Sequence, residues 1–195
     1  MVISRLGEVF FRFRSFTPVP LYIFLFITGT YDTIPFITGT LLIVIGESLR
    51  IMAVGYIGKE SRVSGVTAPI LITSGPYAHM RNPIYTGNIL IYLGFTALSN
   101  SFLILAIPCV FIFFGMIYYC IVIYEETYLR KKFGTDYELY SQLTPRLIPK
   151  YRTIYEDIHH PKFRFDIYTA IKSEQPTFVA LAVCYNLLVL KFFLF

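Results

Sequence analysis

Residues 82–124 read NPIYTGNILIYLGFTALSNSFLILAIPCVFIFFGMIYYCIVIY and contain no charged side chain. A helix that crosses the hydrocarbon core of a bilayer needs about 20 largely apolar residues, so this run is long enough for two such helices. The turn-like sequence LSNS at 98–101 interrupts it once. We therefore predict a helical hairpin with membrane spans at about 83–98 and 101–124.

The rest of the chain adds further apolar runs, and the whole is 55% hydrophobic and only 15% charged. Residues 15–46 carry one charge, within the turn-like TYDTIP, which predicts spans at about 17–31 and 34–57. A fifth span is predicted at 176–195, because proline suits the first turn of a helix. We expect an all-α fold, a single polytopic transmembrane helical bundle of about five spans covering residues 1–195.

The basic residues indicate the orientation of this bundle. All of them except Arg50 and Lys191 fall in three segments, 1–16, 58–83 and 125–175, which five spans place on one side of the membrane. Segments rich in Lys and Arg stay in the cytoplasm. We therefore predict an integral, multi-pass membrane protein whose N-terminus faces the cytoplasm. The net charge of +5 is spread over these segments, so no nucleic-acid partner is expected, and no protein partner is predicted.

Two cytoplasmic segments carry polar and rigid residues that a membrane span does not need. The first, SGPYAHMRNPIYTG at 74–87, has prolines at 76 and 83 that keep the preceding residues out of helix. Its backbone polar groups must find water or a ligand. An ordinary helix start, with proline in the first turn and a basic residue at the headgroups, explains the same residues about as well.

The second segment, YEETYLRKKFGTDYELYSQLTPRLIP at 124–149, follows the charge-free run directly. Its first acidic residues, Glu125 and Glu126, lie near the interface, where a partly dehydrated pair needs positive compensation. That compensation can come from Arg130, from Arg81 across the bundle, or from a cationic ligand. The glycine and prolines beyond predict a compact cytoplasmic cap.

Taken together, GPY–RNP–YTG followed by EE–FG–Y–Y–PR–IP resembles the isoprenylcysteine carboxyl methyltransferase and phospholipid methyltransferase superfamily over about residues 69–149. These are small integral membrane enzymes that use S-adenosylmethionine. The resemblance implies a helical bundle with a small cytoplasmic cofactor-binding cap, whose binding elements are residues 59–87 and 125–150. It also implies methyl transfer to a lipid or lipid-like acceptor that enters from the bilayer.

The resemblance assigns roles to individual positions. The residues that match the family's cofactor-binding positions are Ile70, Leu71, Ile72, Tyr77, Asn82, Pro83, Ile84 and Tyr85. The expected catalytic residues are Glu125 at the reacting centre, Glu126 as its neighbour, and Arg81 for orienting an anionic substrate or phosphate headgroup.

Two positions depart from the prenylcysteine branch of the superfamily. Asn82 stands where that branch usually has histidine, although an amide still offers a donor and an acceptor. Ile121 stands where that branch has an arginine that holds the substrate carboxylate. A prenylcysteine carboxylate, a phospholipid amine, a thiol and an isoprenoid-linked group therefore all stay open as acceptors.

Two other classes of membrane protein also fit the sequence. An NADPH-dependent reductase of sterols or related lipids has a similar helical arrangement, and a non-enzymatic scaffold would use the same motifs only to end helices. Glu47 and Arg50, late in the second span, favour an ion pair over a functional site. The sequence EDIHH at 156–160 has metal-ligand spacing that often arises by chance, so no metal is predicted.

Overall fold

The computed structural model describes residues 2–58, 68–151 and 164–194, and this part of the chain forms eight helices and no strand. The predicted helical bundle is confirmed. The helices are α1 (Val2–Phe13), α2 (Val19–Thr28), α3 (Thr33–Ile57), α4 (Pro76–His79), α5 (Pro83–Leu98), α6 (Leu103–Phe133), α7 (Thr135–Leu143) and α8 (Ile167–Leu194).

The five predicted spans correspond to helices of unequal length. Helices α3, α6 and α8 are long and apolar enough to cross a membrane, which fits an integral membrane protein. Helices α2 and α5 are apolar but have only 10 and 16 residues. At a rise of 1.5 Å per residue, α2 is only about 15 Å long. It is short because prolines stand at its start and Asp32, whose side chain accepts from the Ile34 N–H at 3.1 Å, already begins α3.

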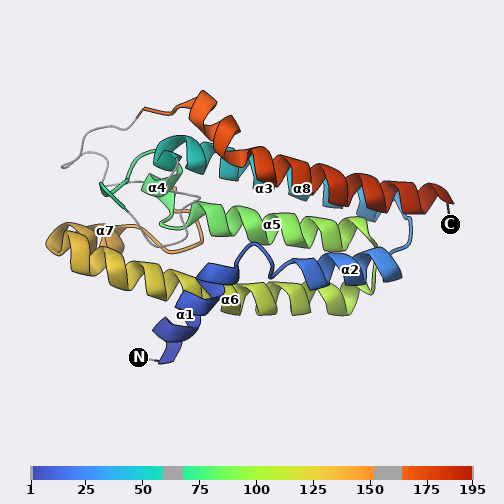
Figure 1. Ribbon diagram of the computed structural model, residues 1–195, viewed down its shortest axis with the longest axis horizontal. Helices are drawn as coiled ribbons and strands as arrows, with labels where there is room; N and C mark the ends of the chain where they lie inside the picture. The colour runs from blue at the N-terminus through green and yellow to red at the C-terminus, as the bar shows by residue number, and fades with distance from the viewer. Residues whose placement is uncertain (1, 59–67, 152–163, 195) are drawn as a thin grey trace.

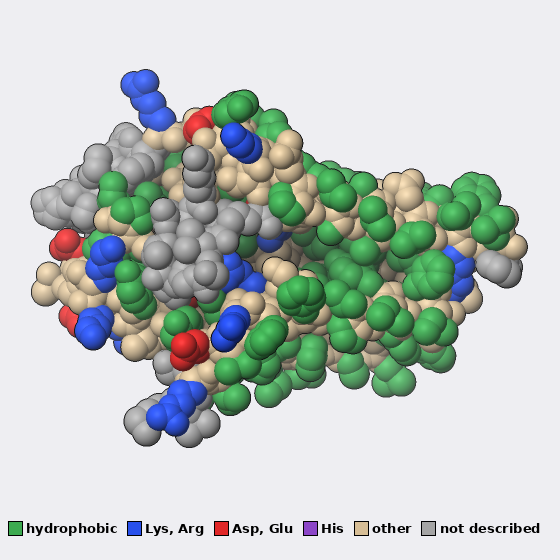
Figure 2. Space-filling model, viewed as in Figure 1, with side chains coloured by type: hydrophobic (Ala, Val, Ile, Leu, Met, Phe, Trp, Pro, Cys, Tyr) green, Lys and Arg blue, Asp and Glu red, His purple; other side chains and the backbone are tan. Residues whose placement is uncertain are grey.

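The long helices run side by side along the molecule, and the short helices α4 and α7 gather at one end (Figure 1). The C-terminus lies at the opposite end. In Figure 2 most Lys, Arg, Asp and Glu side chains on the visible face lie at the α4–α7 end, and hydrophobic side chains cover the rest. We call this charged end the cap. The molecule therefore has an apolar body suited to lipid and a polar cap suited to water.

Helices α3 and α5 pack closely because glycines face each other at two levels. A Cβ atom on Gly46 would lie 2.7 Å from the carbonyl oxygen of Gly87, and one on Gly94 would lie 2.8 Å from that of Gly39. Small residues at such crossings let helix backbones approach in a membrane. This close packing positions the start of α5, where the predicted site begins.

Helix α8 begins earlier than the sequence predicts. Its first turn is capped by Asp166, whose side chain accepts from the Tyr168 N–H at 3.0 Å and from the Thr169 hydroxyl. Pro176, predicted as the helix start, lies inside the helix. The physical reason is that the Asp166 cap, ten residues before Pro176, starts the helix, and the helix continues past Pro176 although proline there removes one backbone hydrogen bond and crowds the preceding turn.

Candidate functional site

A cavity of about 650 Å³ lies where the cap meets the bundle. This volume is within the usual range for small-molecule sites. Both motif segments contribute to its wall, as do α2, α3 and α8. Every residue assigned to the site from the sequence lines this one cavity: Ile70, Leu71, Ile72, Tyr77, Arg81, Asn82, Pro83, Ile84, Tyr85, Glu125 and Glu126.

The start of α5 is held in place by the segment that follows α7. The N–H groups of Arg81 and Asn82 donate to the carbonyl oxygens of Pro145 and Arg146 at 2.8 and 3.1 Å. The Asn82 side-chain amide donates to the same Arg146 oxygen at 3.2 Å and makes no helix-capping bond. Backbone groups that the prolines keep out of helix thus find partners in the cap. These bonds bring residues far apart in sequence to one rim of the cavity.

Gly75 and Tyr77 form the turn that leads into this rim. Gly75 has φ +61°, a left-handed conformation that glycine adopts without strain, and α4 begins directly after it. Tyr140 of α7 donates its hydroxyl hydrogen to the Tyr77 carbonyl oxygen at 2.6 Å. Tyr77 is thereby fixed with its side chain against the cavity.

Tyr77 lines the cavity, and its hydroxyl is a buried polar group. Its oxygen has no hydrogen-bond partner among residues 2–58, 68–151 and 164–194. Burial, and then the negative charge of Glu125, raise the pKa of this hydroxyl well above its ordinary value. It therefore stays protonated as a hydrogen-bond donor, and an unpaired buried donor at a cavity wall is suited to a ligand acceptor atom.

Glu125 lies on the α6 wall of the cavity and is half-buried. Tyr85 of α5 donates its hydroxyl hydrogen to the Glu125 Oε1 atom at 2.7 Å. The Tyr85 ring stacks on Tyr118, with centroids 4.8 Å apart, so the donor itself is held by packing. The two motif segments therefore meet at a carboxylate whose orientation is set by a tyrosine.

Glu126 has a different environment from its neighbour. Its side chain is 5% exposed and accepts from Arg81 Nη2 at 2.7 Å and from Arg146 Nη2 at 3.1 Å. Arg81 also donates to the carbonyl oxygens of Ser141 and Thr144, at 2.5 and 2.6 Å. These contacts give Arg81 and Glu126 a structural role that joins α6 to the cap, and the catalytic role assigned to them stays a prediction.

The compensation of the acidic pair was predicted to come from Arg130, Arg81 or a cationic ligand. Arg81 is the closer partner of Glu126, because Arg130 lies 3.9 Å away with its side chain 52% exposed. Arg146 is a partner that the sequence did not indicate. Its only signal is its place in the PR–IP part of the second motif.

The contact between Arg50 and Glu174 in the cavity wall was not predicted from the sequence either. Arg50 and Glu47 form the predicted ion pair at 3.3 Å, but Arg50 Nη2 also contacts Glu174 Oε2 at 2.6 Å. Arg50 further donates to the side chains of Asn88 on α5 and Thr177 on α8. No periodic pattern links residues so far apart. The EDIHH sequence and residues 59–67 of the loop after α3 lie outside the described residues.

The chain is similar in sequence to known metal-resistance proteins. No solved structure matches it. It is 29% identical over 111 residues to the cobalt-zinc-cadmium resistance protein CzcN of Cupriavidus metallidurans, covering 56% of this chain and 50% of that protein. It is 27% identical over 114 residues to the nickel-cobalt-cadmium resistance protein NccN of Alcaligenes xylosoxydans xylosoxydans, covering 58% and 52%. The chain thus spans about half the length of the curated relatives it matches.

The family comparison identifies which residues match. A family model described as phospholipid methyltransferase matches residues 34–136, which is more than half of the chain. The matched region runs from α3 to the start of α7 and includes both walls at which Tyr85 and Glu125 meet. The chain therefore belongs to the phospholipid methyltransferase family.

Proposed function

We propose that this protein transfers a methyl group from S-adenosylmethionine to a lipid or lipid-like acceptor, and that the reaction takes place in the 650 Å³ cavity. The observation that carries the proposal is the meeting of two separate motif segments at one cavity, where Tyr85 holds Glu125. Membership of the phospholipid methyltransferase family supports the same reaction class.

The residues of the cavity fit the chemical groups of this cofactor. Its sulfonium and ammonium are cationic, and Glu125 with the Tyr85 ring supplies a carboxylate and an aromatic surface. Its carboxylate needs donors, and the buried Tyr77 hydroxyl is one without a partner in the described part of the chain. Its adenine ring needs apolar contacts, which Leu71 and Ile72 supply at the cavity wall. We expect these residues to hold the cofactor.

When bound, the cofactor supplies an electrophilic methyl group on its sulfonium, and the protein's task is to align the acceptor with it. Glu125 is suited to take the proton of an amine or thiol acceptor, because its carboxylate is already oriented by Tyr85. In well-oriented systems, positioning supplies about 7 to 11 kcal/mol of the barrier. The Glu126–Arg81 pair supports this alignment by holding the cap against α6.

The acceptor is proposed to come from the bilayer. Tyr22, Leu181 and Cys184 extend the cavity wall into the apolar body of the bundle, away from the cap. Ile121 is fully buried and offers no charge to a prenylcysteine carboxylate. A prenylcysteine carboxylate, a phospholipid amine, a thiol and an isoprenoid-linked group stay in the proposal as acceptors. A reductase would bind NADPH in place of S-adenosylhomocysteine, and a scaffold would bind neither.

The proposal is tested by removing the Glu125 charge while keeping its shape. Glu125→Gln should lower methyl transfer from radiolabelled cofactor into a lipid extract by about a hundredfold or more, the range for loss of a general base. Glu138→Gln, a change of the same type on the exposed surface of α7, should leave the rate unchanged. Wild-type turnover by a folded Glu125→Gln variant would contradict the proposed role.

A further inference from the structure

Helix α8 forms one wall of the cavity, although it lies beyond the region that matches the family. Its lining residues recur at helical spacing on one side of the helix: Glu174, Pro176, Thr177, Ala180, Leu181 and Cys184. The apolar stretch of α8 is poorly buried, because only 6% of its 18 residues are enclosed by the rest of the protein. Among the described residues of α8, Ala170, Glu174 and Leu188 are buried, and Glu174 is the one of these three that borders the cavity.

Arg50 fixes the cap-proximal end of this wall. Its side chain is 8% exposed, and its guanidinium contacts the Glu174 side chain, which is 1% exposed, at 2.6 Å. The same guanidinium donates to Thr177 Oγ1 at 3.2 Å and to the Asn88 side chain on α5. A buried, charge-assisted contact of this kind holds its partners in a narrow range of positions. Arg50 therefore sets the distance between α8 and the α3–α5 pair.

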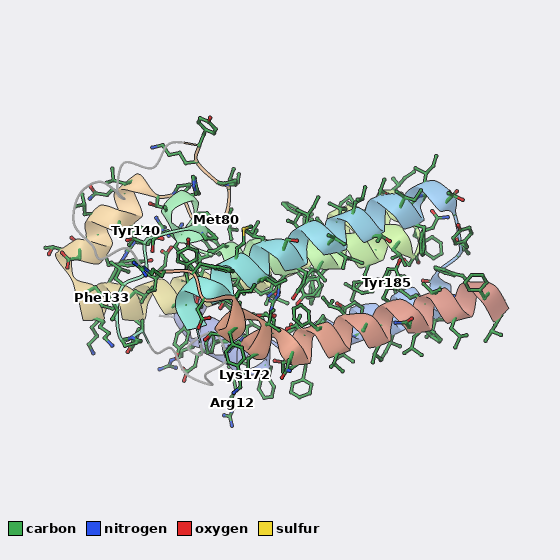
Figure 3. The ribbon with its side chains drawn as sticks, turned by 90° about the horizontal axis from the view of Figure 1, so that it is seen from above. Arg12, Met80, Phe133, Tyr140, Lys172 and Tyr185 are labelled. Carbon is green, nitrogen blue, oxygen red and sulfur yellow. The ribbon has the colours of Figure 1, made fainter. Side chains whose placement is uncertain are left out.

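The far end of α8 is held by two other contacts. The Tyr185 hydroxyl lies 3.2 Å from Thr40 Oγ1, and Figure 3 shows Tyr185 between α8 and α3. Lys191 donates to the carbonyl oxygens of Ile27 and Gly29 at 3.1 and 2.6 Å. Helix α8 is thus tied to the bundle at both ends, and the cavity lies along the face between Glu174 and Tyr185.

The chemistry of this wall changes along the helix. Near the cap it carries Thr177, beside the buried Glu174, and one turn further it carries the small or apolar Ala180, Leu181 and Cys184. An amphiphile fits such a surface, with its polar group beside the polar turn and its chain along the apolar residues. The width of the apolar part depends on the size of the side chain at position 180.

We propose that α8 is the element of this protein that selects the acceptor: Arg50 positions the helix through Glu174, and Ala180 and Leu181 determine which apolar chain fits. The proposal rests on the proposed methyl transfer and assigns its acceptor side to residues outside the family match. Cofactor binding, by contrast, is assigned to the α4, α5 and α6 side of the cavity.

The test compares two alanines of α8 that face different surroundings. Both alanines are exposed, but Ala180 borders the cavity, whereas Ala182 lines neither of the two described cavities. The full chain, carrying Ala180→Phe or Ala182→Phe, is assayed with alkyl amines and alkyl thiols of short, medium and long chain. S-adenosylhomocysteine affinity is measured for each variant by calorimetry.

In Ala180→Phe, methylation of the longest chains should fall about tenfold while the shortest chains and S-adenosylhomocysteine affinity change by less than about twofold. Ala182→Phe should match the wild type. An equal loss for all chain lengths, or no difference between the variants, would overturn the proposal. So would a wild type that binds S-adenosylhomocysteine but methylates none of the chains. A wild type that does not bind S-adenosylhomocysteine would instead overturn the proposed function, and this inference with it.

Discussion

Two adjacent glutamates directly after the charge-free run have different surroundings in this structure. Glu126 is enclosed by Arg81 and Arg146, whereas Glu125 faces the cavity and is held by a neutral tyrosine. A buried carboxylate is costly unless it is paired, and here the pairing also joins α6 to the cap. Because Glu126 already has cationic partners, Glu125 is the carboxylate that stays available to a ligand.

The stability of the cap should depend on Arg81 far more than on Arg130. Arg81→Gln leaves Glu126 short of its closest partner and removes donors from the carbonyls of Ser141 and Thr144, so we expect a loss of about 3 kcal/mol. Arg130→Gln removes an exposed, distant contact and should cost less than about 1 kcal/mol. Thermal unfolding in detergent measures both, and equal shifts in the midpoint would count against this account.

At the level of elements, the site depends on how α5 lies against α3. The glycine contacts at Gly46–Gly87 and Gly39–Gly94 leave no room for a side chain between the backbones. This packing sets the position of the α5 start, and so of Asn82 and Tyr85. A change that separates the two helices should therefore disturb the cavity as well as the bundle.

A matched pair of glycine substitutions tests this packing. In Gly46→Ala the added Cβ would lie 2.7 Å from the Gly87 oxygen, and such overpacking costs about 1 to 3 kcal/mol. In Gly115→Ala, on α6, the added Cβ meets nothing within 4 Å, so the variant should be as stable as the wild type or up to about 1 kcal/mol more stable. The unfolding midpoints should differ in that order. A Gly46→Ala variant as stable as Gly115→Ala would show that the backbones can separate freely.

Some elements could be predicted from the sequence and others could not. The hairpin of α5 and α6 could be predicted from the charge-free run, because a helix that crosses a membrane must be apolar along its whole length. The predicted start of α8 at Pro176 was wrong. The helix is capped by Asp166, which lies in a polar segment where a pattern of apolar residues gives no information. The close packing of α3 and α5 was not predicted, although both helices carry glycines, which are small residues of the kind that allow such packing.

For the whole molecule, the arrangement of the site was partly predictable. The two motif segments were expected on one side of the bundle, and all residues assigned to them line one cavity. The contact between Arg50 and Glu174 joins positions 124 residues apart and depends on how α8 docks, which no local pattern encodes. The chain orientation and the boundaries of the membrane spans stay predictions, with the polar cap of Figure 2 expected to face the cytoplasm.

Calorimetric titration of the purified wild-type protein with S-adenosylhomocysteine, and separately with NADPH, tests the central claim most directly. The account predicts saturable binding of S-adenosylhomocysteine, reduced by at least about tenfold in Tyr77→Phe because the buried hydroxyl is lost as a donor, and no binding of NADPH. Binding of NADPH alone would indicate the reductase instead. Binding of neither ligand by the folded protein would contradict the assignment of the cavity to a methyl donor.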